Sequence, residues 1–330
     1  MALRLADQWV WDFWFAVDGA EVHIFYLRAD RAWQNPDLRH WNVSIGHGVS
    51  RDLCNWTTLP PVMAPAPEAG SPDSCTTWTG SIIRHHGLWH MFYTGTSRQE
   101  GGLVQRICLA TSSDLHHWEK HPQRDWVPFD PCWYDQLELS RWHDQSWRDP
   151  WVVRDPADGR FHMFITCRVN DGPVDGRGAI GHACSTDLAH WEVQKPVLAP
   201  GWFAEMEVPQ VERIGPRYYL LCSVSARYHS AVRRQGMTAA PRTGTMYFVA
   251  DSLTGPYRTL DDPFLVGDEV GTLYAGRLLH TAARGWMFFA ARIFDPAGNF
   301  IGEISDPLPL EVWPDGRLSV TAVQGGNHER

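Results

Sequence analysis

The chain has 330 residues and a formal net charge of -9 at pH 7, with 38 Asp and Glu against 29 Lys and Arg. This acidic balance, without a dense run of Lys and Arg, argues against nucleic acid as a partner. No stretch approaches about 18 consecutive apolar residues, so the sequence predicts no membrane span. Asp7, Gln8 and Asp12 interrupt the N-terminal apolar stretch, so we expect no signal peptide and a cytoplasmic protein.

Cysteine, histidine and tryptophan narrow the class further. The seven cysteines form no CxxC pair and several lie in apolar runs, which predicts reduced thiols. The 16 histidines include no HExxH motif, and we expect neither a metal site nor a cofactor. The 18 tryptophans stand out. Because indole faces suit the C–H surfaces of sugars, they favour a small carbohydrate as the ligand.

A short aromatic and apolar segment recurs five times along the chain. The copies are GAEVHIFYL (19–27), GLWHMFYTG (87–95), GRFHMFITC (159–167), GPRYYLLCS (215–223) and RGWMFFAAR (284–292). A turn residue followed by β-rich residues predicts a strand in each copy. No long stretch with a period of about 3.6 residues predicts a substantial helix.

A second motif, Ser-x-Asp-Leu-x-x-Trp, ends at Trp56, Trp118 and Trp191, and a decayed copy ends at Tyr257. Its Asp suits the capping of a hairpin turn, while its Leu and Trp are expected to pack between sheets. Five strand copies with these hairpins predict an all-β fold, a five-bladed β-propeller of four-stranded antiparallel blades. We expect one domain over residues 1–330. Two β-sandwiches are the alternative, and the repeat disfavours them because it continues without a linker.

Three acidic stretches interrupt the repeat, each shortly before an aromatic strand. They are VWDFW with Asp12, WRDPWVVRD with Asp149, and AEMEVPQV with Glu205 and Glu207. Because the strand that begins each propeller blade lines the central channel, these acids are expected to converge on the axis. Acids in equivalent frames of three blades indicate a catalytic site more strongly than any one of them alone.

Local spacing suggests roles for the charged residues. Glu205 and Glu207 are two residues apart, so they share a face of an extended strand. Their like charges raise at least one pKa, which suits a general acid. Arg148 lies on the face opposite to its neighbour Asp149, and we expect it to pair elsewhere or to donate to a ligand hydroxyl.

Aromatic and hydroxyl residues near these acids are candidates for a binding wall. Strand alternation places Trp14 on the face of Asp12 and places Trp11 and Phe13 on the other face, which favours Trp14 over Phe13 for the pocket wall. In TTWTGSII, Trp78 could stack on a sugar ring, and Thr79 or Ser81 could hydrogen-bond a hydroxyl. In DEVGTLYAGRLL, the inward group is expected to be Tyr274.

The blocks VWDFW, WRDP and EMEVPQ resemble, in chain order, the three acidic blocks of five-bladed-propeller glycoside hydrolases. The pattern is most similar to the levansucrase and β-fructofuranosidase group, glycoside hydrolase families 68 and 32, and TWTGS resembles their Trp-Ser-Gly-Ser block. The sequence departs from family 32 in lacking Asn-Asp-Pro-Asn-Gly in the first block. We also expect no C-terminal β-sandwich of the kind that family 32 enzymes carry. Thr79 replaces the usual Ser, and Val208 stands where Arg is usual.

The resemblance implies a division of labour among these side chains. Asp12 would be the nucleophile and Glu207 the acid/base. Asp149 would stabilise the transition state by holding sugar hydroxyls, and Glu205 would bind substrate or tune Glu207. The sugar subsite would be lined by Trp11, Trp78, Thr79, Arg148 and Tyr274. The implied reaction on a small fructoside, hydrolysis or transfer, proceeds with retention through a covalent glycosyl-enzyme.

Two alternatives remain open from the sequence. Family 43 shares the propeller and a similar acid trio, and an inverting arabinofuranosidase or xylosidase of that kind would use Asp12 as a general base. Carboxyl groups about 5 to 5.5 Å apart favour retention, whereas about 6.5 to 9.5 Å favours inversion. The second alternative is a propeller that binds a sugar or a glycosylated metabolite without hydrolysing it.

Overall fold

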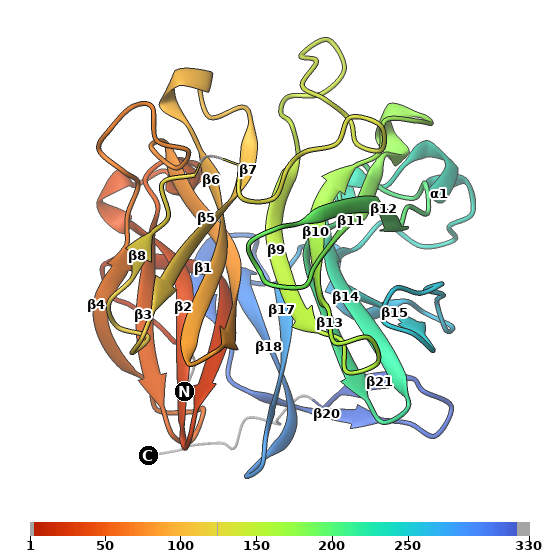
Figure 1. The fold of residues 1–330 in the computed structure, drawn as a ribbon. Coiled ribbons are helices and arrows are strands. Elements are labelled where there is room, and N and C mark those ends of the chain that lie inside the picture. Colours follow the sequence, from red (N-terminus) through yellow and green to blue (C-terminus); the bar gives the residue numbers. More distant parts are fainter. Residues whose placement is uncertain (1–2, 124, 322–330) are drawn as a thin grey trace.

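The computed structural model describes residues 3–123 and 125–321, which form five sheets arranged around one axis (Figure 1). The first strand of every sheet is innermost. These innermost strands contact one another in a ring, in the order β1, β5, β9, β13 and β17, and β17 returns to β1. The predicted all-β five-bladed propeller is confirmed.

Four blades have four antiparallel strands each. Blade one contains β1 (Gln8–Asp18), β2 (Glu21–Asp30), β3 (Ser44–Ser50) and β4 (Thr57–Met63). Blade two contains β5 (Thr76–His85), β6 (Leu88–Thr96), β7 (Gln105–Ser112) and β8 (Glu119–Lys120). Blade three contains β9 (Trp147–Arg154), β10 (Phe161–Arg168), β11 (Gly178–Ser185) and β12 (Glu192–Leu198). Blade four contains β13 (Glu207–Ile214), β14 (Arg217–Val224), β15 (Thr243–Ala250) and β16 (Phe264–Asp268).

Blade five has one strand more than the sequence predicts. It contains β17 (Leu273–Thr281), β18 (Gly285–Phe294), β19 (Phe300–Ile304), β20 (Leu308–Val312) and β21 (Leu318–Val320). Both β19 and β20 pair with different parts of β18, so the third strand of this blade is divided in two.

Helical structure is confined to short connections. The 3-10 turns are η1 (Arg31–Trp33), η2 (Pro36–His40), η3 (Arg98–Glu100), η4 (Val174–Gly176) and η5 (Ala226–Tyr228). The α-helix α1 (Ala231–Gln235) has five residues. Across the described ranges, no helix combines the length and the apolar character that crossing a bilayer requires.

The repeated aromatic segments form the second strand of each blade: β2, β6, β10, β14 and β18. Their apolar side chains fill the junctions between neighbouring blades. For example, Phe92 of blade two and Met163 of blade three share one buried cluster, and Val10 of blade one and Phe289 of blade five share another. Burial between sheets explains why these segments read as nearly continuous apolar runs.

The Ser-x-Asp-Leu-x-x-Trp motif forms a hairpin turn, as predicted. In its first copy, the Ser50 hydroxyl accepts a hydrogen bond from the backbone N–H of Leu53 at 2.9 Å, and the Asp52 carboxylate accepts from the N–H of Asn55 at 2.7 Å. The same bonds recur in the second and third copies. Leu53 has a φ of 63°, a left-handed conformation that the Ser and Asp caps hold in place.

Each innermost strand carries a β-bulge near its N-terminal end. Asp12 and Thr79 are the unpaired extra residues of β1 and β5. In β9, β13 and β17, two residues oppose one on the neighbouring strand, namely 149–150, 208–209 and 275–276. A bulge bends its strand and re-aims the side chains beside it. The five bulges therefore turn polar groups toward one point on the axis.

Two blades contain a buried histidine pair at equivalent positions on their second and third strands. His23 and His47 lie 2.9 Å apart between Nδ1 and Nε2, and His162 and His182 repeat this contact at 2.9 Å. An imidazole pair of this kind needs one ring to accept, so at least one ring is neutral. Burial lowers the pKa of His47 to about 3 and that of His182 to about 4.

These lowered pKa values predict acid-sensitive stability. Below about pH 6.5 the unfolded chain binds protons that the folded pairs refuse, so the stability present above that pH is lost as the pH falls. We expect His47 and His182 each to remove about 2 kcal/mol from the free energy of unfolding at pH 5. The difference in Tm between pH 7.5 and pH 5 should be smaller in a His182→Gln variant, and unchanged in the exposed-site control His280→Gln. If the His182→Gln variant showed the same difference in Tm between the two pH values as the wild-type protein, this account would be contradicted.

Candidate active site

The bulges surround a cavity of about 430 Å³ at the propeller axis. Eight of the residues singled out in the sequence line it: Trp11, Asp12, Trp78, Thr79, Arg148, Asp149, Glu205 and Glu207. The three acidic blocks therefore converge, as predicted from their equivalent positions in three blades. The cavity has the volume of a small-ligand site.

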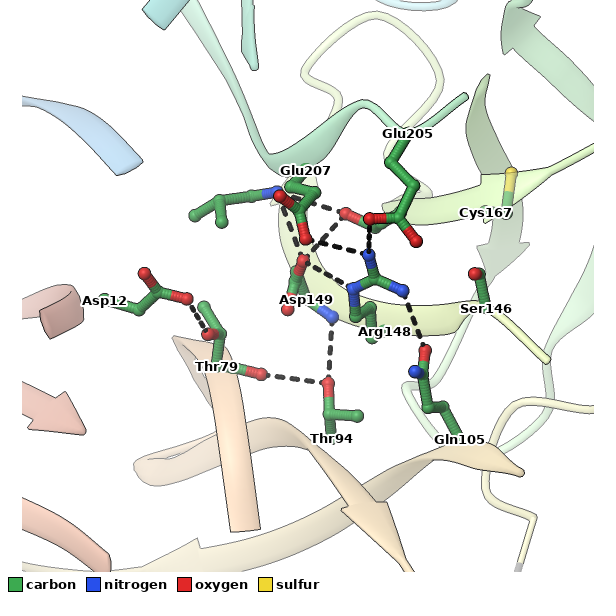
Figure 2. A network of polar contacts seen from close by, with 12 residues as sticks. Asp12, Thr79, Thr94, Gln105, Ser146, Arg148, Asp149, Cys167, Glu205 and Glu207 are labelled. Atoms are coloured by element: carbon green, nitrogen blue, oxygen red, sulfur yellow. Dashed lines mark hydrogen bonds and ion pairs between the residues drawn. The ribbon is translucent and has the colours of Figure 1, made fainter. Parts of the chain in front are cut away.

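Arg148 lies among the carboxylates and pairs with several of them (Figure 2). Its Nη2 lies 2.8 Å from Oε1 of Glu207 and 3.1 Å from Oε2 of Glu205, and its Nε lies 3.7 Å from Oδ2 of Asp149. Glu205 lies just before β13 and Glu207 is its first residue, and both carboxylates contact the same nitrogen of Arg148. Although burial opposes the charge, these acids hold the pKa of Arg148 well above its usual range.

Asp149 is almost fully buried and has three hydrogen-bond partners, one from its own blade and two from neighbouring blades. The Thr166 hydroxyl donates to its Oδ2 at 2.8 Å, and the backbone N–H of Val208 donates to the same oxygen at 3.2 Å. Its own N–H donates to the Thr94 hydroxyl at 2.8 Å. The position of Asp149 is therefore fixed by blades two, three and four together.

Asp12 is held by blade two. The Thr79 hydroxyl donates to Oδ2 of Asp12 at 2.6 Å (Figure 2). Burial raises the pKa of Asp12, and the hydrogen bond from Thr79 and the charges of Arg277 and Arg39 oppose that rise. Among the described residues, Oδ1 of Asp12 receives no hydrogen bond, so this oxygen is available to a ligand.

Glu207 receives donors from two blades. In addition to Arg148, the Tyr274 phenol of blade five donates to its Oε2. Burial and the nearby Glu207 hold the pKa of Tyr274 well above its usual range, so the phenol keeps its proton and remains a donor. The Glu207 side chain is 23% exposed, against 5% for both Asp149 and Glu205, which makes it the most accessible carboxylate of the three.

Three bulge residues have left-handed backbone conformations: Asp149 (φ 56°), Val208 (φ 55°) and Ala275 (φ 50°). A positive φ in the β-branched Val208 is a strained conformation, which costs on the order of 1–3 kcal/mol. The N–H of Val208 uses this conformation to reach Asp149. The strain therefore couples the acidic blocks of blades three and four.

Trp14 does not line the cavity, which corrects the prediction from strand alternation. The bulge at Asp12 resets the alternation, so Trp14 lies on the same face as Trp11. Trp14 is 0% exposed and stacks on Phe25 between blades. Of the two tryptophans beside Asp12, it is Trp11 that lines the cavity.

Ser81 is also displaced from the site by a bulge. The extra residue Thr79 in β5 puts Ser81 on the junction with blade three, where its hydroxyl accepts a hydrogen bond from the N–H of Val152 at 3.1 Å. Ser81 is 1% exposed and joins two blades, so its role is structural. Tyr274 reaches the site, as predicted, through Glu207.

Residues that the sequence analysis missed complete the cavity. They include His40, Trp41, Leu103, Gln105, His143, Asp144, Arg227 and Tyr228. They lie mostly in connections, three of which follow a second strand, namely 31–43, 97–104 and 225–242. In an antiparallel pair, the end of the second strand lies beside the start of the first. The predicted strand order therefore contained the signal that these connections surround the site.

One wall of the cavity is aromatic. The indole N–H of Trp78 donates to the carbonyl of His40 at 2.9 Å, which fixes the ring at the cavity. Trp41 lies beside Trp78, with ring centroids 6.0 Å apart, and is 48% exposed. Arg227 and Tyr228 also line the cavity, with the guanidinium of Arg227 4.4 Å from the centroid of the Tyr228 ring.

Two groups of His and acidic side chains have ligand atoms close enough for a metal ion. His143, Asp144 and Glu205 form the first group, at the cavity. Glu205 already pairs with Arg148, and Asp144 accepts a hydrogen bond from Gln105 at 2.7 Å, so protein donors already compensate these two acids. The second group consists of Asp155, Asp158 and His162, at the hairpin between β9 and β10, and none of these residues lines the cavity. The expectation of no metal stays a prediction.

The environment of Asp149 predicts a stability that depends on pH in a direction opposite to the histidine pairs. Burial raises the pKa of Asp149 to about 7, so between about pH 4 and pH 7 the folded state binds the proton that the unfolded chain releases. The resulting stability is lost as the pH rises toward 7. Asn cannot ionise, so Asp149→Asn avoids this loss of stability. We expect the change in Tm that the substitution causes to be more favourable at pH 8 than at pH 5, by about 2 °C or more.

Thermal melts of the two proteins at both pH values check this expectation. Asp18→Asn is the matched control, because Asp18 lies at the exposed end of the same strand as Asp12. Its effect on Tm should be the same at both pH values. Equal effects of Asp149→Asn at pH 5 and pH 8 would show that Asp149 ionises without a cost to the fold.

Comparison with known proteins identifies the family. The chain matches the model of the glycosyl hydrolases family 32 N-terminal domain over residues 15–275. An insoluble β-fructofuranosidase isoenzyme of Arabidopsis thaliana is 32% identical over 178 residues, which cover 52% of this chain and 27% of that protein. Sucrose-6-phosphate hydrolase of Zymomonas mobilis is 27% identical over 184 residues, which cover 54% of this chain and 31% of that protein. The match thus spans less than a third of these relatives' length.

Solved structures show the same fold. Inulosucrase from Halalkalicoccus jeotgali bound to kestose has a TM-score of 0.78 at 23% identity, over 96% of this chain and 88% of that one. Bacillus subtilis levansucrase has a TM-score of 0.74 at 16% identity, over 96% of this chain and 87% of that one. The family match favours family 32 over family 43. Because it spans Thr79, Asp149 and Glu207 and most of the chain, the protein belongs to glycosyl hydrolase family 32.

Proposed function

We propose that the protein cleaves a small β-fructofuranoside, such as sucrose or a short fructan, and passes the fructosyl group to water or to an acceptor hydroxyl. The observation that carries this proposal is the convergence of Asp12, Asp149 and Glu207 from three blades in one cavity. The names of the relatives support it, since they include a β-fructofuranosidase and a sucrose-6-phosphate hydrolase. A cavity of about 430 Å³ suits two or three sugar rings better than a polymer chain.

The first step would form a fructosyl-enzyme. Oδ1 of Asp12 attacks the anomeric carbon, the glycosidic C–O bond breaks, and Glu207 gives its proton to the departing oxygen. The Thr79 hydrogen bond holds Oδ2 and leaves Oδ1 for the attack. The charges of Arg277 and Arg39 favour the ionised carboxylate that a nucleophile requires.

The second step would reverse the proton transfer. Glu207, now a carboxylate, takes a proton from water or from an acceptor hydroxyl, whose oxygen attacks the anomeric carbon. The bond to Asp12 breaks and the free Asp12 carboxylate is restored. Arg148 and Tyr274 hold the two oxygens of Glu207 and so keep it oriented between the steps.

Asp149 would hold the fructosyl ring during both steps. Its Oδ2 is occupied by Thr166 and Val208, which leaves Oδ1 for sugar hydroxyls. A hydrogen bond to a carboxylate strengthens as positive charge develops on the sugar in the transition state. Because burial raises the pKa of Asp149 to about 7, this interaction is expected to be strongest above neutral pH.

The proposal predicts distinct losses in two variants. Asp12→Asn removes the nucleophile, and we expect no detectable release of fructose from sucrose. Glu207→Gln removes the acid/base and should lower kcat for sucrose by about 10²–10⁴-fold, since general acid–base catalysis contributes about that factor. For an aryl fructoside, whose leaving group needs little protonation, kcat of Glu207→Gln should fall by a smaller factor. Enzymatic assay of released fructose and glucose measures each rate.

The control variant is Asp18→Asn, which removes an exposed carboxylate from the far end of the same strand as Asp12. It should keep the wild-type rate. Activity that survives in both Asp12→Asn and Glu207→Gln would overturn the catalytic assignment. Calorimetric binding of sucrose by a wild-type protein that never turns it over would favour a non-hydrolytic propeller.

The stereochemistry of transfer is a separate prediction. A double displacement through Asp12 gives overall retention, so reaction of sucrose in dilute methanol should yield the methyl β-fructofuranoside. Nuclear magnetic resonance of the product, taken before it is consumed again, identifies the anomer. The α anomer would show inversion and would make Asp12 a general base.

A further inference from the structure

Arg277 is a fully buried arginine that directly follows the bulge of blade five, and the proposed reaction steps give it no contact with substrate. Its side chain is 0% exposed, and its guanidinium lies over the ring of Trp151 at 4.9 Å. One of its nitrogens, Nη2, has no hydrogen-bond partner although it is buried. An arginine is expensive to bury in this way, so its contacts need an explanation.

The guanidinium joins the backbones that follow two of the catalytic carboxylates. Its Nε donates to the carbonyl of Phe13, the residue after Asp12, at 3.3 Å. Its Nη1 donates to the carbonyls of Pro209 at 2.6 Å and Val208 at 3.4 Å, the residues after Glu207. One planar, rigid group thus connects the bulges of blades one and four.

We propose that Arg277 is a positioning residue that fixes the separation of Asp12 and Glu207. Its positive charge also acts on Asp12 and opposes the rise in pKa that burial causes there. This inference rests on the proposed fructoside chemistry. The separation of two glycosidase carboxyl groups decides whether water or a covalent bond occupies the space between them. A group that ties both backbones beneath the side chains therefore acts on the reaction without touching substrate.

The charges around Asp12 define how Arg277 acts on it. Asp12 faces Thr79 of blade two, Asp149 of blade three, Glu207 of blade four, Tyr274 and Arg277 of blade five, and Arg39 of the connection after β2. Burial and the charge of Glu207 raise the pKa of Asp12, whereas the hydrogen bond from Thr79 and the charges of the two arginines lower it. Removal of Arg277 leaves Arg39 as the one cation of this set.

Asp149 and Glu212 are the other acids that face Arg277. Burial lowers the pKa of Arg277 to about 10 while these acids and Asp12 oppose that change, so the guanidinium stays charged at neutral pH. Gln210, which donates to Glu212 at 3.0 Å and to the carbonyl of Leu278 at 2.8 Å, completes the polar layer below the cavity.

Two substitutions separate position from charge. Arg277→Lys keeps the charge but cannot reach the carbonyls of both blades with one ammonium, so kcat should fall at least about tenfold while the pKa of Asp12 stays near its wild-type value. Arg277→Met removes the charge as well, so kcat should fall about 100-fold and the pKa of Asp12 should rise above its wild-type value. Thermal melting and circular dichroism establish that each variant is folded.

Two independent measurements are made. Initial rates of fructose release give kcat, and carbon-13 resonance of Asp-labelled protein gives the pKa of Asp12, whose signal an Asp12→Asn variant identifies. Arg277→Lys carries the test by itself if Arg277→Met does not fold. If the wild-type protein turns over no fructoside, the proposed function fails, and the pKa of Asp12 in the variants still decides the inference.

Arg31 provides the matched control. It also joins blades one and five, with Nε donating to the carbonyl of Gln8 at 3.0 Å and Nη2 to that of Ile301 at 2.9 Å, but it lies away from the cavity. Arg31→Met should lower Tm without changing kcat or the pKa of Asp12. The inference is overturned if the folded Arg277 variants keep wild-type kcat and pKa, or if Arg31→Met changes both as strongly as they do.

Discussion

The pairing of Arg148 with the acids around it is the interaction on which the site depends. Asp149, Glu205 and Glu207 lie in one partly desolvated cavity, where mutual repulsion would otherwise protonate them or push them apart. Arg148 contacts all three, and its innermost-strand position brings it there from blade three. Removal of one partner from a buried ion pair costs about 3–5 kcal/mol, because the remaining charges are left uncompensated. The acids can therefore be kept close together only while this guanidinium lies between them.

Bulges in the innermost strands allow the blades to place polar groups close together at the propeller axis. A regular strand would alternate its side chains between two blade junctions and leave few for the axis. With an extra residue in each, β1 presents Asp12, β5 presents Thr79 and β9 presents Asp149. The bulge of β13 turns the N–H of Val208 toward Asp149, and Tyr274 lies beside the bulge of β17. Asp149, Val208 and Ala275 have strained backbone conformations with positive φ. Hydrogen bonds such as that from the N–H of Val208 to Asp149 compensate this strain. Strain of this kind is typical of functional sites that the surrounding fold over-determines.

The repeat made the fold and the convergence of the acids predictable, and the bulges limited the rest. Equivalent positions in repeated blades needed only the strand period, which is why Asp12, Asp149 and Glu207 could be placed together. Trp14 and Ser81 were misplaced because one extra residue reverses every side chain after it. The stretch VWDFW around Asp12 contains no Gly or Pro, the residues that mark many bulges. The connections that supply residues such as His143 and Tyr228 have no period at all, so their approach to the cavity follows only from the strand order. The third strand of blade five, which is divided into β19 and β20, likewise lies in a turn-rich segment without a copy of the repeat.

The position of the site relative to the ring closure links catalysis to the stability of the whole fold. Blades one and five belong to separate sheets, and they meet through side-chain packing, the bridge between Leu3 and Ile304, and bonds such as those of Arg31. Asp12 lies on one side of this junction, and Tyr274 lies on the other. A small opening of the ring would therefore change the distance between the nucleophile and the partner of Glu207 before any blade unfolded. A bond across this junction close to the cavity, such as that from Arg277 to the carbonyl of Phe13, acts on that distance directly. Bonds made by residues that do not line the cavity, such as those of Arg31, act on it only through the rigidity of the blades.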